Sequence, residues 1–301
     1  MNKGVVSVLV AYLIWGLYPF YFHAMQHVAP TEIVIHRVLW TFALLAVYLF
    51  CSRRWRWIQK AITDRRTVAV FLMSSVLITA NWSTYTYAIV TNQTLEASLG
   101  YFMNPLVSVL LGTVFLKEKL NKAQMLAIVF ACAGVMWVTF KQGEFPALGL
   151  TLALSFGFYG LVRKMAPLGS LEGLTLETAF AFPVALLATF YFAGNGDLTF
   201  VHGTSWDKFW LIMAGPITTI PLILFAYGLK QVPYSTVGFI QYLSPTMVFF
   251  IGLFFFGEEL QVDRLIGFIL IWTGVLIFVG ENFFRSHSGY RTEFNLSLIH
   301  I

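Results

Sequence analysis

The chain has 301 residues, of which 58% are hydrophobic and 11% are charged, and its formal net charge is +5. Soluble domains carry roughly 25% charged residues, so this composition excludes an ordinary soluble enzyme or binding domain. The two cysteines, Cys51 and Cys132, have no histidine at metal-ligand spacing, which predicts free thiols and no metal or cofactor.

Apolar segments long enough to cross a bilayer as helices follow one another along the chain, beginning just after Lys3. A bilayer core requires about 20 apolar residues in a helix, whereas barrel strands require about ten residues of alternating pattern. Short links with charges and turn-forming residues separate the segments. We expect an all-α polytopic membrane protein with ten transmembrane helices, near residues 5–23, 33–51, 68–90, 97–116, 123–140, 147–165, 173–193, 208–229, 234–256 and 263–283.

Lysine and arginine residues are concentrated in every second link. If the N-terminus lies in the cytoplasm, most of the 19 Lys and Arg residues fall on the cytoplasmic side, including those in 53–66 and 117–122. Arg163 and Lys164 are assigned to a cytoplasmic link on the same basis. This bias predicts a multi-pass protein of the bacterial inner (plasma) membrane with both termini in the cytoplasm. It also accounts for the positive charge without a nucleic-acid partner.

An internal repeat emerges when the sequence is shifted by 140 residues. The matches include a proline, a glycine and an acidic turn: Pro105 with Pro245, Gly112 with Gly252, and Glu118 with Glu258. Since each repeat holds five helices, an odd number, the second repeat enters the membrane upside down. Inverted repeats of this kind are typical of transporters with a central site and alternating access. We expect one repeat at 3–140, an inverted one at 143–284, and a disordered tail at 285–301.

Several long phrases also resemble a known family. They are AYLIWGLYPFYF (11–22), PTEIVIHRVLW (30–40), ANWSTYTYAI (80–89), LEASLGYFMNPLVSVLLG (95–112), ALSFGFYGLVRK (153–164) and IQYLSPTMVFFIGLFFFGE (240–258). Over residues 3–284 the sequence resembles the drug/metabolite transporter superfamily, in its EamA-type ten-helix group, and within that group the RarD (chloramphenicol-sensitive) branch. The resemblance implies an exporter or permease of small metabolites or drugs in which each half is an EamA-like repeat.

Ionisable residues inside the membrane are costly and are therefore functional candidates. His36 and Arg37 lie in the second predicted helix near its outer side, and Glu177 occupies the equivalent place of the seventh near its inner side. Arg37 either holds an anionic group of a substrate or extends from the helix end to the interface. Glu177 either carries protons or is a buried structural group. At roughly 7 Å inside opposite faces, about 15 Å separate Arg37 from Glu177, which predicts no permanent ion pair.

Polar and aromatic residues follow helical spacing in several segments. Asn81 and Tyr85 share a helix face, as do Tyr101 and Asn104. We expect these stripes to line a cavity for a small amphipathic or aromatic solute, although interhelical hydrogen bonding is the alternative use. The expected substrate-binding residues are Trp15, Tyr18, His36, Arg37, Asn81, Trp82, Tyr85, Tyr101, Asn104, Tyr159, Glu177, Tyr227, Gln241, Tyr242 and Ser244.

Pro105 and Pro245 occupy equivalent places in the two repeats. Because proline frees a backbone carbonyl and bends a helix, these two residues are candidate hinges, with static kinks as the alternative. Small residues in 123–140 and 263–283 predict close helix packing, or alternatively a homodimer contact.

The sequence predicts a secondary active or facilitative transporter whose partners are a small-molecule substrate and the lipid bilayer. No GxxxxGK[ST] motif for a nucleotide is present in the sequence. Two alternatives are a channel or membrane-embedded structural subunit, and a membrane-embedded enzyme. The enzyme would need converging His, Asp, Glu or Ser groups, and no HExxH motif or convincing triad occurs, so we expect no enzymatic activity.

Overall fold

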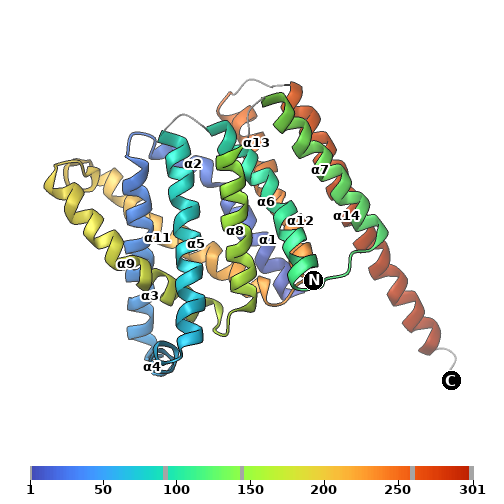
Figure 1. The fold of residues 1–301 in the computed structure, drawn as a ribbon, viewed down its shortest axis with the longest axis horizontal. Helices are drawn as coiled ribbons and strands as arrows, with labels where there is room; N and C mark the ends of the chain where they lie inside the picture. The colour runs from blue at the N-terminus through green and yellow to red at the C-terminus, as the bar shows by residue number, and fades with distance from the viewer. Residues whose placement is uncertain (1, 91–93, 143–145, 258–261, 298–301) are drawn as a thin grey trace.

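A computed structural model describes residues 2–90, 94–142, 146–257 and 262–297. These residues form helices joined by short links, without a β-strand in the described ranges (Figure 1). The helices are α1 (Lys3–Gly16), α2 (Tyr18–Ala24), α3 (Pro30–Ser52), α4 (Arg56–Thr63), α5 (Arg65–Val90), α6 (Thr94–Phe115), α7 (Lys122–Gln142), α8 (Ala147–Met165), α9 (Ser170–Gly194), α10 (Thr199–His202), α11 (Ser205–Leu229), α12 (Tyr234–Gln241), α13 (Leu243–Phe255) and α14 (Val262–Ser297).

Seven helical segments within the described residues are long and apolar enough to cross a membrane. They comprise α1 with α2, α3, most of α5 and α7, α9, α11, and α12 with α13. Helices α6, α8 and α14 occupy the other three segments in which the sequence predicts spans. The protein is therefore an all-helical polytopic membrane protein. Helix α14 continues to Ser297 and so enters the segment 285–301 that was expected to form a tail.

Two of the long apolar segments are interrupted where prolines follow. The segment of α1 and α2 breaks at Leu17, two residues before Pro19, and the segment of α12 and α13 breaks at Tyr242, three residues before Pro245. A proline ring clashes with the carbonyl of the residue four positions earlier, which explains a break just upstream. Helix α6 by contrast runs through Pro105 without a change of element.

Helices α7 and α14 lie side by side at one edge of the bundle (Figure 1). Their backbones touch at glycines: a Cβ added to Gly134 would lie 2.6 Å from the Gly267 carbonyl oxygen, and one added to Gly274 would lie 2.5 Å from that of Ala127. The small residues of the two predicted segments thus pack against one another within the chain.

We predict that Gly274→Leu lowers the free energy of unfolding, because a side chain there forces α14 away from α7. The expected cost is about 1–3 kcal/mol, typical of overpacking, measured by thermal unfolding in detergent. Gly280→Leu is the matched control, since no atom lies within 4 Å of a Cβ added on that part of the same helix. Equal thermal stability of the two variants would contradict the α7–α14 packing.

Candidate functional site

A cavity of about 420 Å³ lies between the helices of both halves of the chain. Its wall contains these residues of the set expected from the sequence: Trp15, Tyr18, Arg37, Asn81, Trp82, Tyr85, Tyr101, Asn104, Gln241 and Ser244, together with Pro245. The rim contains Phe22 of α2 and Phe256, which follows α13; the α6 residue Tyr101 in the wall is 47% exposed. A solute of moderate size therefore has room between the two halves.

Arg37 supplies a positive charge to the cavity wall. Its Nε donates a hydrogen bond of 3.0 Å to Thr218 Oγ1 of α11, and its guanidinium carbon lies 4.3 Å from the centre of the Trp82 ring. Among the described residues, Arg37 has no ion pair with a carboxylate. The tyrosine rings of Tyr85 and Tyr101 lie near it, within electrostatic range. This arrangement fixes the guanidinium while leaving its charge for an anionic guest.

Aromatic rings form much of the remaining wall. The Trp15 ring centre lies 4.9 Å from that of Tyr12 and 5.8 Å from that of Phe156, in edge-to-face arrangements. Tyr12 was missed from the sequence, although it shares a face of the first helix with Trp15 and Pro19 at i, i+3 and i+7 spacing. Phe156 and the other wall phenylalanines had no distinguishing signal among the 30 phenylalanines of the chain.

Asn81 contributes to the wall and also joins two helices. Its Nδ2 donates hydrogen bonds of 3.0 Å each to the Leu152 carbonyl oxygen and to Ser155 Oγ, both on α8. Both alternatives that the sequence left open thus describe this residue: it lines the cavity, and its amide donor binds α5 to α8.

Three polar groups of the cavity wall lack hydrogen-bond partners among the described residues. They are the Tyr12 hydroxyl, Asn104 Oδ1 and Gln241 Nε2. The three residues are 4%, 8% and 2% exposed, respectively. Ser108 Oγ donates to Gln241 Oε1 at 3.0 Å and so orients the amide with its nitrogen unused. Buried polar atoms are nearly always paired, so this part of the wall is suited to a polar guest.

The other expected site residues lie outside the cavity wall. His36 Nδ1 accepts a hydrogen bond of 2.9 Å from Trp40, and Glu32 beside it accepts from the backbone at the start of α10. Tyr242 is buried next to α7 and α14, and Tyr227 is 43% exposed on α11. Each of these three residues therefore has surroundings that differ from those of the cavity residues.

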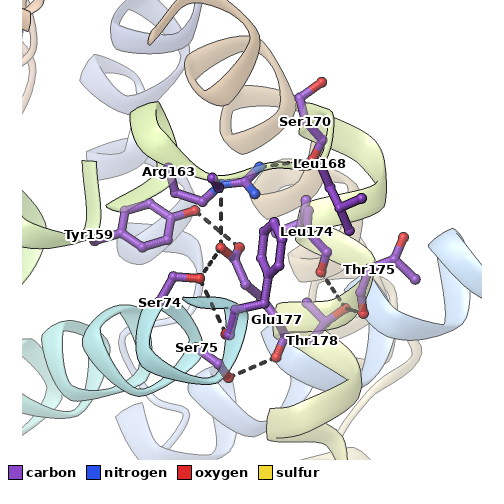
Figure 2. A network of polar contacts seen from close by, with 12 residues as sticks. Ser74, Ser75, Tyr159, Arg163, Leu168, Ser170, Leu174, Thr175, Glu177 and Thr178 are labelled. Atoms are coloured by element: carbon purple, nitrogen blue, oxygen red, sulfur yellow. Dashed lines mark hydrogen bonds and ion pairs between the residues drawn. The ribbon is translucent and has the colours of Figure 1, made fainter. Parts of the chain in front are cut away.

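Glu177 and Tyr159 belong to a separate buried network, shown in Figure 2. The Glu177 carboxylate lies 3.3 Å from Arg163 Nε and accepts hydrogen bonds from Ser74 Oγ at 2.5 Å and Tyr159 at 3.3 Å. Arg163 Nη2 donates to the Ser170 carbonyl oxygen at 3.0 Å. Glu177 thus pairs with Arg163 of the neighbouring helix, in agreement with the expectation that it does not pair with Arg37.

The assignment of Arg163 to a cytoplasmic link was wrong. The residue is 1% exposed within α8, because the helix continues to Met165 and its guanidinium turns inward. A Cβ on Gly173 would overlap Arg163 Nη1, so this glycine of α9 makes room for the charge. A glycine one turn before the intramembrane Glu177 was the available signal, but the contact between α8 and α9 that gives it meaning is tertiary.

Opposite the rim, aromatic packing and crossed helix caps close the bundle. Tyr159, Phe225 and Tyr234 are fully buried there, and the Tyr234 hydroxyl donates to the Gly157 carbonyl oxygen at 2.6 Å. Three contacts, which we name the latch, join the helix ends: Glu118 accepts from the backbone N–H groups of Tyr234 and Ser235; Lys164 donates to the Leu229 and Val232 carbonyls; and Lys230 donates to those of Ala166 and Leu168. Each contact places a charge at the helix end that favours it.

We predict that Glu177→Gln destabilises the protein, because the buried Arg163 guanidinium loses its counter-charge. The expected loss is about 3–5 kcal/mol of unfolding free energy, measured by thermal unfolding in detergent. The double variant Glu177→Gln with Arg163→Met should recover part of it, since neither charge then remains. A single variant as stable as the parent protein would refute the structural importance of the pair.

Comparison with known proteins gives the family. The model of the EamA-like transporter family matches the chain twice, at residues 2–140 and 146–280. The chain is 40% identical to the uncharacterized transporter YojE of Bacillus subtilis over 92% of this chain and 93% of that protein. It is 37% identical to protein RarD of Escherichia coli, over 92% and 94%. It is 38% identical to protein RarD of Salmonella typhi, over 92% and 95%.

A chain of known crystal structure also shares the fold. It superimposes with a TM-score of 0.67 at 14% identity, over 92% of this chain and 98% of its own. Because both family matches and relatives above 30% identity extend over most of the sequence, the chain belongs to the EamA-like transporter family, in the RarD branch of the drug/metabolite transporter superfamily, and is a multi-pass bacterial membrane transporter.

Proposed function

We propose that this protein is a secondary carrier that moves a small aromatic or amphipathic anion across the bacterial inner membrane by alternating access. In this proposal ten transmembrane helices form two inverted repeats, at 3–140 and 143–284, and both termini lie in the cytoplasm. The observation that carries it is the cavity between the two halves, where Arg37 presents a positive charge without a carboxylate partner. The two family matches, at 2–140 and 146–280, support the two repeats.

The cavity chemistry supports an anion with an apolar or aromatic body. Arg37 favours a carboxylate, sulfonate or similar group, since a guanidinium binds oxyanions through charge-assisted hydrogen bonds. The rings of Trp15, Trp82 and Phe156 offer stacking surfaces at the same time. A cation would meet the Arg37 charge, and a polar sugar would leave the aromatic wall unused.

The closed end of the bundle supports a carrier more than a channel. The latch and the buried Tyr159, Phe225 and Tyr234 block the path on the side of the N-terminus, which is cytoplasmic in the predicted topology. The cavity then faces outward in this conformation. Opening the other way requires the latch to break, and its members are charged groups near the water-exposed ends of helices, where water can replace the protein partners.

We predict exchange of 4-methylbenzenesulfonate, a permanently ionised aromatic anion, by the purified protein in liposomes. Labelled anion should enter vesicles preloaded with unlabelled anion and accumulate transiently, because a carrier couples the two half-cycles. Arg37→Gln should reduce the exchange about 100-fold, through loss of roughly 2–3 kcal/mol of charge-assisted binding. Lys208→Gln, which removes another basic residue outside the cavity wall, should leave it unchanged. Flux without counterflow would favour a channel.

We predict that loosening the latch changes the side from which the cavity is reached. In a background of Cys51→Ser and Cys132→Ala, a thiol at Ser244→Cys in the wall should react with a membrane-impermeant reagent from outside. Adding Lys164→Met and Glu118→Gln should slow that reaction severalfold and permit labelling from the cytoplasmic face of inverted vesicles.

Lys119→Met, an exposed residue of the same link as Glu118, is the control and should leave the labelling as in the background. Unchanged outside labelling in the latch variant would remove the latch from the mechanism. Labelling of the background protein only from the cytoplasmic side would reverse the proposed orientation.

A further inference from the structure

The three unpartnered polar atoms of the cavity wall constrain the substrate further than Arg37 does. Asn104 and Ser108 are one helical turn apart on α6, and Ser108 holds Gln241 of α12 by the hydrogen bond to its Oε1. The Gln241 amide therefore lies on the α6 face that also carries Asn104. A free acceptor, Asn104 Oδ1, and a free donor, Gln241 Nε2, face the cavity from the same region of its wall.

We infer that the transported anion also carries an amide, whose N–H donates to Asn104 Oδ1 and whose carbonyl accepts from Gln241 Nε2. The inference rests on the proposed function, because it assigns a second recognition point to the same cavity. An acceptor and a donor side by side match the two faces of one amide group. A hydroxyl or carboxylate alone would leave one of the two protein atoms unpaired, at the cost that buried unpaired groups carry.

The two recognition points lie on different sides of the cavity. Arg37 is fixed to α11 through Thr218 and lies over Trp82, whereas Gln241 is fixed to α6 through Ser108. Tyr12 lies at the second point, and its ring contacts Trp15 at 4.9 Å between centres. The aromatic wall near Trp15 thus receives the apolar body of the solute. The substrate class is an N-acylated aromatic or aliphatic acid, with its carboxylate at Arg37.

The alternative occupant of this region is water, which both donates and accepts hydrogen bonds. If only water binds Asn104 and Gln241, then a solute with an amide gains nothing over one without it. A pair of solutes that differ in one N–H group separates the two cases, because their size, charge and aromatic ring are the same.

The test compares N-acetyl-L-phenylalanine with 2-benzyl-4-oxopentanoate, in which a methylene replaces the amide N–H. Each is used to inhibit the exchange of 4-methylbenzenesulfonate in liposomes. We expect the amide to inhibit at about a tenfold lower concentration, since the ketone leaves Asn104 Oδ1 buried without a donor. Equal inhibition by the two anions overturns the inference while the exchange itself leaves the proposed carrier function intact.

Variants place the discrimination on the two side chains. Asn104→Leu and Gln241→Met should each reduce the tenfold preference to about twofold or less, while the sulfonate, which has no amide, is still exchanged. Gln231→Met is the matched control on the exposed link before α12 and should keep the preference. If the cavity variants fold but retain the full preference, Asn104 and Gln241 do not read the amide. If they fail to fold, the comparison of the two solutes on the parent protein still decides.

Discussion

Lipid forms no hydrogen bonds with the groups that it surrounds, so each polar side chain of this bundle needs a partner in the protein or in a water-accessible cavity. Two buried arginines show the two outcomes. Arg163 contacts the Glu177 carboxylate and the Ser170 carbonyl, and lies over the Phe71 ring. Arg37 has Thr218 and Trp82 but no described carboxylate. The first charge is neutralised by the fold, and the second remains for a guest.

The same constraint separates permanent from breakable contacts. The Glu177 network is buried among α5, α8 and α9, where breaking it would leave charges without water. The latch uses equally polar groups, but at helix ends next to the links: Lys230 is exposed at the end of α11, and Lys164 and Glu118 are partly exposed. Burial and the nearby Arg163 lower the pKa of Lys230, and Glu172 opposes that shift. Contacts of this second kind are the ones that a conformational cycle can exchange for water.

Periodicity and the cost of intramembrane charge were sufficient to predict helices, the polar stripes of α5 and α6, and the candidate status of Arg37 and Glu177. They were insufficient for Arg163 and for the caps made by Glu118, Lys164 and Lys230, because these depend on which helix ends meet. Charges near a link look alike in the sequence whether they face water or a neighbouring helix. The phenylalanine wall was also not predictable, since a phenylalanine facing lipid and one facing the cavity have the same spacing.

A carrier must release what it binds, and the position of Gln241 offers a way to do so on the proposed mechanism. Helices α6 and α12 cross closely, since a Cβ on Gly238 would lie 2.8 Å from the Pro105 carbonyl oxygen. Asn104 and Gln241 flank this crossing on opposite repeats. A rotation of one repeat about the crossing changes the distance between the acceptor and the donor, and α12 ends at Gln241, where the chain already bends. The amide would then be held by both atoms only while the two halves keep one relative orientation, so the motion that opens the other side also weakens binding.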